Sequence, residues 1–126
     1  RAGTQTAWSF GNDEKALGDY AWYKENAADI VSEQYAHQVG LKKPNAFGLY
    51  DMHGNVFEWC HDYYGVYYYK QSPEKDPTGP ASGDSRVLRG GSWFNSSRFT
   101  RSANRYWRDA VNLYGNVGFR LVRELD

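Results

Sequence analysis

The sequence predicts a mixed α+β domain with short strands, long loops and little regular secondary structure. Aromatic residues make up 17% of the chain, with 11 tyrosines and 5 tryptophans. Rings whose OH and NH groups need partners favour a loop-rich core held by side-chain hydrogen bonds. Only a few short segments show strand-like alternation, and the sequence contains no repeats and no coiled-coil heptads.

The first half of the chain is predicted to be mostly loops and turns. Residues 1–25 mix small, aromatic and charged residues with glycine, which indicates short strands and loops, and residues 16–26 suit a helical turn. Residues 27–38 are compatible with either a helix or an irregular loop. Residues 48–53 suit a tight turn or a short helical piece. Residues 56–62 alternate well enough for a strand.

The second half is predicted to hold two strands separated by long irregular segments. Residues 71–85 contain three prolines and read as a surface loop. Residues 86–89 favour a strand that ends at two consecutive glycines. Residues 92–116 form either a long ordered loop or a loop with one helical turn near 101–106, and a loop of that length is usually functional. Residues 117–123 are predicted to be a terminal strand.

Length and charge limit the classes of function. The 126 residues are one domain's worth of chain, and position 1 is Arg rather than Met, so we expect a processed product or a fragment. No apolar run is long enough to span a bilayer. Acidic and basic residues balance at 15 each, which argues against general nucleic-acid binding.

The basic residues are concentrated in the second half of the chain. Residues 1–63 contain 5 Lys/Arg and 9 Asp/Glu, whereas residues 64–126 contain 10 and 6. The late arginines either form internal ion pairs and stack on aromatic rings, or favour an anionic ligand or an acidic partner.

The single cysteine, Cys60, excludes a disulfide within the chain and leaves the compartment open. We expect it to be a buried thiol. Cys60, His61 and Asp62 are consecutive, and neighbours on a strand point to opposite faces, so they cannot form a catalytic triad with one another. The three histidines also lack the close spacing of a helical zinc pair.

The segment from Asn45 to Trp59 is the clearest candidate for a binding site. If the chain is extended here, the carbonyls of Gly54 and Val56 point to one side. Asp51 and Glu58 place two carboxylates nearby. Carbonyl and carboxylate oxygens are the ligands that calcium prefers. The alternative is that the two carboxylates cap the turn by accepting backbone NH groups.

Three blocks of sequence resemble the formylglycine-generating enzymes, also called sulfatase-modifying factors, and occur in the same order. They are Gly-Leu-Tyr-Asp-Met-His-Gly-Asn-Val-Phe-Glu-Trp at 48–59, Arg-Val-Leu-Arg-Gly-Gly-Ser-Trp at 86–93 and Val-Gly-Phe-Arg-Leu-Val at 117–122. The resemblance implies one C-type-lectin-like domain over residues 1–126, missing its N-terminal portion. That missing segment or chain would be a partner.

The resemblance also implies a bound calcium ion. In the family this metal is held by groups that match the Asp51 and Glu58 side chains and the Gly54 and Val56 carbonyls. A second calcium site of the family lies near Asn26, but the residues that follow depart from its pattern, so this site cannot be mapped.

Active members of the family hold copper with two cysteines in the block after Gly-Gly-Ser-Trp and oxidise a substrate cysteine. Soft thiolates select Cu(I), and serine or threonine hydroxyls cannot replace them. Here residues 92–102 read Ser-Trp-Phe-Asn-Ser-Ser-Arg-Phe-Thr-Arg-Ser and contain no cysteine. We therefore expect neither copper nor this oxidase activity, which predicts a pseudoenzyme.

Segment 93–115 is predicted to be a recognition surface, because it mixes aromatic anchors with adaptable polar groups. The alternative is that many of its rings belong to the core. The segment corresponds to the active-site groove of the family and resembles the variable segment of lectin-like proteins diversified by retroelements, which bind proteins. The predicted ligand-binding residues are Trp93, Phe94, Asn95, Ser96, Arg98, Asn104, Tyr106, Trp107, Arg108 and Tyr114.

The favoured hypothesis is a non-catalytic, calcium-stabilised domain that uses segment 93–115 to bind a peptide, a protein or a small polar ligand. The alternative is an enzyme, either a formylglycine-generating oxidase with an unusual site or the substrate-binding half of a sulfoxide synthase. The iron of such a synthase is held by three histidines of a separate helical domain. A third hypothesis is a structural fragment that functions only with a missing N-terminal chain.

Overall fold

The computed structural model describes residues 1–123, and these confirm a mixed α+β fold dominated by loops. The described part contains one short α-helix, α1 (Leu17–Tyr20). Its strands are β1 (Phe57–Tyr63), β2 (Ser85–Arg89), β3 (Tyr106–Asp109) and β4 (Val117–Gly118). Short 3₁₀ turns occupy Glu14–Ala16, Lys24–Asn26, Val31–Glu33, Tyr68–Lys70 and Ser97–Phe99.

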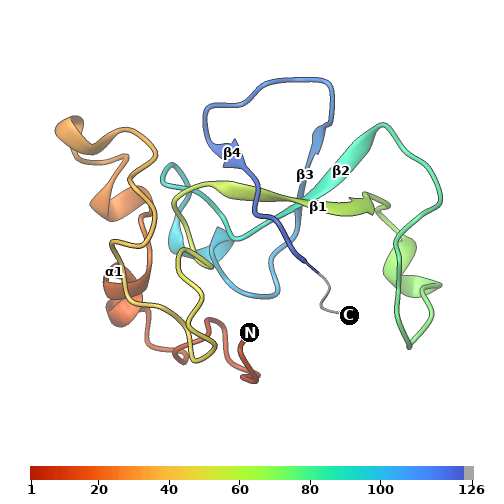
Figure 1. Cartoon of the computed structure of the whole chain (residues 1–126), viewed down its shortest axis with the longest axis horizontal. Coiled ribbons are helices and arrows are strands. Elements are labelled where there is room, and N and C mark those ends of the chain that lie inside the picture. Colours follow the sequence, from red (N-terminus) through yellow and green to blue (C-terminus); the bar gives the residue numbers. More distant parts are fainter. Residues whose placement is uncertain (124–126) are drawn as a thin grey trace.

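The four strands form one sheet in the order β3-β2-β1-β4. The two central strands pair antiparallel, β3 adds antiparallel to β2, and β4 adds parallel to β1. The N-terminal third of the chain, with α1, lies at one end of the sheet, and the connection from β1 to β2 extends from the other end (Figure 1). The sheet thus separates two loop-rich regions that are distant in sequence.

Three features of the second half differ from what the sequence predicted, including the position of the helical turn that was one of two alternatives for residues 92–116. The helical turn lies at Ser97–Phe99 rather than near 101–106, and β3 is a strand that the sequence did not predict. Its pairing with β2, where Val87 lies opposite Trp107 and Leu88 opposite Tyr106, overrides the lack of local periodicity. The terminal strand predicted over 117–123 is limited to β4, because only Val117 and Gly118 pair with β1.

The core of the N-terminal region confirms a packing based on rings and hydrogen bonds. Trp8 and Leu17 are buried together with Ala21. The Trp8 ring stacks on Phe10 at a centroid distance of 5.7 Å, and its indole Nε1 donates to Thr100 Oγ1 at 2.9 Å. This hydrogen bond joins the first ten residues to the segment that follows β2.

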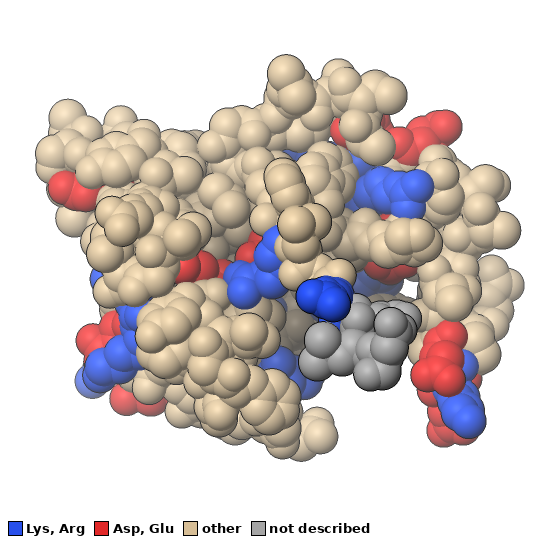
Figure 2. All heavy atoms as spheres, in the orientation of Figure 1, with Lys and Arg blue, Asp and Glu red and all other residues tan. Residues whose placement is uncertain are grey.

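Charged side chains of both signs are interspersed over the surface. On the face shown in Figure 2, Lys and Arg side chains lie beside Asp and Glu side chains at several places. This distribution agrees with the balance of 15 basic and 15 acidic residues. No helix in the part of the chain that the structure describes is long and apolar enough to cross a membrane.

The Gly54–Asn55 turn connects distant segments through main-chain hydrogen bonds. The Gly54 amide donates to the Gly90 carbonyl at 2.8 Å, and the Asn55 amide donates to the Trp22 carbonyl at 2.7 Å. The Asn55 carbonyl accepts from the Trp93 amide at 2.8 Å. Both turn residues have positive φ, 77° and 62°, so the expected extended conformation at Gly54 was wrong. The extended chain begins only at β1.

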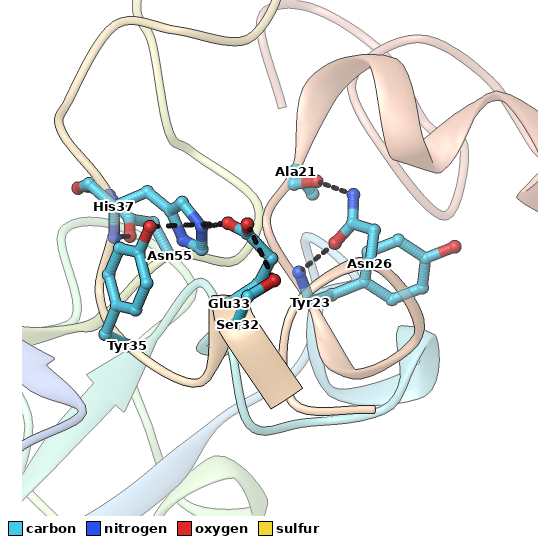
Figure 3. Close-up of polar contacts among 8 residues, drawn as sticks. All are labelled: Ala21, Tyr23, Asn26, Ser32, Glu33, Tyr35, His37 and Asn55. Atoms are coloured by element: carbon cyan, nitrogen blue, oxygen red, sulfur yellow. Dashed lines mark hydrogen bonds and ion pairs between the residues drawn. The ribbon is translucent and has the colours of Figure 1, made fainter. Parts of the chain in front are cut away.

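The Asn55 side chain fixes the loop around His37 (Figure 3). Its Oδ1 accepts from the His37 amide at 2.9 Å, and its Nδ2 donates to the His37 carbonyl at 3.1 Å. The His37 ring lies between Trp22 and Tyr35, with centroid distances of 3.8 and 4.5 Å. Its Nε2 also contacts Glu33 Oε2 at 2.8 Å. Residues 27–38 are thus mostly irregular, which was one of the two alternatives left by the sequence. The contacts of His37 and Asn55 hold this loop in one conformation.

Candidate functional site

Three of the four predicted calcium ligands line one cavity of about 400 Å³. They are Asp51, Val56 and Glu58; Gly54 does not line it. Apolar side chains form part of its wall, and Arg120 completes it. The structure thus brings both carboxylates and one of the two predicted carbonyl-bearing residues to the same place.

Asp51 has an unused carboxylate oxygen. Its side chain is buried, and its Oδ2 accepts from the Gly40 amide at 2.8 Å. Its Oδ1 is also buried and has no hydrogen-bond partner among the described residues. A buried carboxylate oxygen without a partner carries an energetic penalty that a cation would remove. This oxygen therefore fits a hard metal ion.

Glu58 already has a cationic partner. Arg120 Nε donates to Glu58 Oε2 at 2.8 Å, and Arg120 Nη2 donates to Glu58 Oε1 and, at 3.0 Å, to the Tyr50 carbonyl. Hydrogen bonding to Glu58 raises the pKa of the Arg120 guanidinium, and the charge of Asp51 adds to this effect. A calcium ion here would share Glu58 with Arg120 or displace it.

The first residues of segment 93–115 form a partly exposed aromatic pair. The Trp93 ring is half-buried and meets the Phe94 ring edge-to-face at a centroid distance of 5.6 Å. Phe94 is 62% exposed. Of this pair, Phe94 presents the larger surface to a ligand.

Several polar residues of the segment are used within the fold. Asn95 Oδ1 accepts from Ser92 Oγ at 2.5 Å, and the Asn95 carbonyl accepts from the Lys24 amide at 3.0 Å. The Ser96 carbonyl accepts from the Phe99 amide, closing a 3₁₀ turn. The Asn104 carbonyl accepts from an arginine side chain. Through these groups, the three predicted ligand-binding residues also shape the loop.

Tyr106, Arg108 and Tyr114 lie together. The Arg108 guanidinium lies over both rings, at 4.7 Å from the Tyr106 centroid and 5.3 Å from the Tyr114 centroid. Its Nη1 also donates to the Tyr106 hydroxyl at 2.9 Å. Trp107 is 43% exposed and stacks on Tyr64 at a centroid distance of 5.8 Å and on Tyr106 at 6.5 Å. Aromatic and cationic groups of the segment are therefore in contact with one another around β3.

Arginine–ring contacts include the predicted Arg98 and extend to arginines outside the predicted set. Arg98 lies over Phe99 at 4.9 Å, and Arg86 over Tyr63 at 3.9 Å. Arg105 lies over Tyr69 at 4.3 Å. Two sequence signals indicated these contacts, the excess of arginine in the second half and its run of tyrosines. Which arginine meets which ring depends on how the sheet brings distant residues together. Stacking was one of the two uses predicted for these arginines.

The thiol of Cys60 and the imidazole of His53 are both shielded from solvent, the imidazole more than the thiol. Cys60, expected to be a buried thiol, is only half-buried on β1, and this partial burial raises the pKa of its thiol. His53 Nδ1 contacts the Thr100 carbonyl at 2.8 Å, and its Nε2 accepts from the Ser9 amide at 3.1 Å. Burial lowers the pKa of His53. Within residues 1–123, no three His, Cys, Asp or Glu side chains gather as a metal site.

The whole chain is similar to one known domain family. The model of the sulfatase-modifying factor enzyme 1-like domain matches residues 1–125. Over 87 residues the chain is 41% identical to a formylglycine-generating enzyme of Streptomyces coelicolor, which covers 67% of this chain and 28% of that protein. Over 86 residues it is 44% identical to the serine/threonine-protein kinase pkn1 of Chlamydia pneumoniae, covering 66% of this chain and 14% of the kinase. The chain thus spans less than a third of either relative.

Among solved structures, the Treponema denticola variable protein 1 superposes with a TM-score of 0.82. The two sequences are 42% identical, and the match covers 94% of this chain and 41% of the Treponema chain. This likeness agrees with the order of strands and loops described above.

Proposed function

Because this chain belongs to the sulfatase-modifying factor enzyme 1-like family, we propose that it is a recognition domain of that family without oxidase activity. It binds a peptide, a protein or a small polar ligand through segment 93–115. Calcium stabilises the scaffold that presents this segment.

The observation that carries the proposal is the chemistry of residues 92–102. This block contains no cysteine, and the hydroxyl groups of Ser92 and Thr100 are tied into the framework. Thr100 Oγ1 donates to the Ser97 carbonyl at 2.8 Å and accepts from the Trp8 indole, while Ser92 Oγ bonds to Asn95. Hydroxyl and amide groups do not provide the paired soft ligands that Cu(I) requires. The thiol of Cys60, whose pKa is raised, is a poor substitute.

The exposed groups of the segment support recognition. Phe94, Arg98 and Trp107 present aromatic and cationic surface beside polar main chain. Aromatic rings and arginine are the groups that most often dominate binding energy. Similarity to a protein named variable protein 1, over nearly the whole chain, favours the same use of the fold.

Calcium would be held by the carboxylates of Asp51 and Glu58 and by the carbonyls of Gly54 and Val56. The unpartnered Oδ1 of Asp51 supports this assignment. The ion would neutralise the buried carboxylate charge and would fix the chain between residues 51 and 58. It would have no part in chemistry.

Selection from a displayed peptide library tests the recognition role. Selected peptides are expected to bind Trp107→Ser about tenfold or more weakly than the unaltered chain, because an aromatic anchor often contributes 2 kcal/mol or more. Val66→Ser is the matched control, because Val66 is 70% exposed in the β1–β2 connection, outside the segment. An equal loss of peptide affinity in both variants would contradict the proposal. A selection that yields no peptide able to bind the unaltered chain would also contradict it.

A second assay tests the absence of oxidase activity. The chain is incubated with Cu(I), oxygen and a cysteine-containing sulfatase-type peptide, and the peptide is analysed by mass spectrometry. No formylglycine above the protein-free background is expected. Turnover that depends on the chain would overturn the non-catalytic part of the proposal.

A further inference from the structure

A second cavity, of about 300 Å³, lies beside segment 93–115 and has a cationic wall. Its volume is at the lower limit of small-molecule sites and suits a group the size of one amino-acid residue. Its polar lining consists of Arg1, His53, Glu58, Arg89, Arg101 and Ser102.

The positive charge of this wall is not balanced by nearby carboxylates. Among the described residues, none of its three arginines forms an ion pair. Glu58 is the one acidic residue in the lining, and its carboxylate is engaged by Arg120. The cavity therefore attracts an anion.

Arg89 is held in place for such contacts. Its Nη1 donates to the carbonyls of Ser102 and Asn104 at 3.4 and 3.2 Å, and its Nη2 donates to the Tyr69 hydroxyl at 3.3 Å. A guanidinium fixed by several partners loses little side-chain entropy when it binds a ligand. Arg89 thus supplies a preorganised cation at the wall.

Arg101 and Ser102 supply donors that the fold does not use. Within the described chain, only Nε of the Arg101 side chain has a partner, the Arg98 carbonyl at 2.9 Å. Its terminal amino groups suit the two oxygens of a carboxylate. The Ser102 hydroxyl is buried and lacks a partner in the described residues. A bound oxygen would satisfy it.

We propose that this cavity binds a carboxylate group of the ligand, through Arg101 and Arg89 with the Ser102 hydroxyl. The inference rests on the proposed recognition function, because Arg101 and Ser102 belong to segment 93–115. It adds the chemical class of the group recognised. The carboxylate belongs either to the C-terminus of a peptide or to an acidic side chain.

Two small probes of equal size test the site on the unaltered chain. N-acetylglycine carries a carboxylate, and N-acetylglycinamide replaces it with a neutral amide. In calorimetric or NMR titrations the acid is expected to bind at least about tenfold more tightly, since hydrogen bonds between charged groups are stronger than those to a neutral amide. Equal affinities, or no binding of the acid, would overturn the proposal.

Variants of one arginine show whether the cavity is responsible. Arg101→Gln is expected to remove the preference for the acid, and Arg101→Lys to retain part of it. Arg86→Gln is the control, because Arg86 stacks on Tyr63 and does not line this cavity. Thermal melting checks that each variant is folded. A preference that survives in folded Arg101→Gln would reject the assignment.

Peptides then distinguish the two sources of the carboxylate. Binding of a glycine-rich hexapeptide acid, with loss in its C-terminal amide, supports recognition of the C-terminus. If an amidated peptide with an internal glutamate regains binding, the recognised carboxylate is that of an acidic side chain. If N-acetylglycine fails to bind, peptides from the display selection can still bind the chain and lose affinity in Trp107→Ser. Failure of this cavity and failure of the recognition role therefore give different results.

Discussion

At the scale of single residues, the conformation of the Gly54–Asn55 turn depends on the absence of a side chain. Gly54 has a φ of 77°, and a Cβ there would lie 2.1 Å from the Trp22 carbonyl oxygen. Gly48 has a φ of 76°, but a Cβ there meets nothing within 4 Å. The two positions therefore separate backbone strain from a steric clash.

Gly54→Ala is expected to lower the free energy of unfolding by more than about 4 kcal/mol or to prevent folding, because main-chain atoms must move apart. Gly48→Ala is the matched control and should lose only about 1–2 kcal/mol from left-handed strain. Urea denaturation measures both. Similar losses in the two variants would show that contact with Trp22 is unimportant.

His53 should make stability sensitive to acid. Because the Ser9 amide can only donate and the Thr100 carbonyl can only accept, the fold requires a neutral ring with its proton on Nδ1. Burial lowers its pKa below the ordinary 6.5, so the unfolded chain binds more protons and the stability contribution is lost as pH falls below about 6.5.

The free energy of unfolding is measured from about pH 7.5 to 5.5 in the presence of a chelator, the range in which histidine titrates. The unaltered chain is expected to lose stability across this range, and His53→Gln to lose clearly less. The exposed His61 provides the control, and His61→Gln should retain the slope of the unaltered chain. An unchanged slope in His53→Gln would contradict this account.

At the scale of elements, the contact between β1 and the residues after β4 is electrostatic. Glu58 lies on β1, and Arg120 follows β4 by two positions. Their side chains are partly shielded, with 21% and 34% exposed. The Lys43–Asp19 pair, at 62% and 59%, is much more exposed. The first pair should therefore matter more to stability.

Arg120→Met should lower the free energy of unfolding in chelator by about 1–2 kcal/mol, a value reduced for partial solvent screening. Calcium should restore more stability to this variant than to the unaltered chain, since it replaces the lost cation beside Glu58. Lys43→Met should cost at most about 1 kcal/mol and leave the response to calcium unchanged. Equal calcium responses in all three proteins would place the metal elsewhere.

At the scale of the whole molecule, calcium should act as a stabilising ligand. A calcium concentration about 100 times the dissociation constant adds about 2.7 kcal/mol to the free energy of unfolding. Differential scanning calorimetry should show a higher melting temperature with calcium than with chelator, and magnesium serves as the control because it requires a stricter geometry. Superimposable melting curves would refute the calcium site.

The sequence predicted the two central strands, but it did not predict features that depend on tertiary contacts. Residues 56–62 and 86–89 alternate, and they correspond closely to β1 and β2. Tyr106 and Trp107 became strand residues through pairing with β2 and ring stacking, which no local pattern reveals. The left-handed conformation at Gly54, where the chain passes close to the Trp22 carbonyl, likewise reflects a contact between segments distant in sequence.

For the candidate calcium site, the sequence indicated which residue types to expect better than how they are arranged. Asp51, Val56 and Glu58 line one cavity, but Gly54 does not, and the extended chain that the spacing argument assumed is absent at Gly54. Arg120 was not foreseen there, because its position beside Glu58 follows from the parallel pairing of β4 with β1. Arg101 and Arg89 similarly meet only through the folded path of the chain.

The main-chain hydrogen bonds of the Gly54–Asn55 turn bear on how this protein can evolve. The bonds to Trp22, Gly90 and Trp93 use amide and carbonyl groups, which every residue except proline supplies in full. Replacing exposed side chains of segment 93–115, such as Phe94 and Arg98, removes no group that takes part in these bonds. Exposed positions of this segment can therefore vary during evolution, and with them the ligand, while the turn that supports the fold is retained.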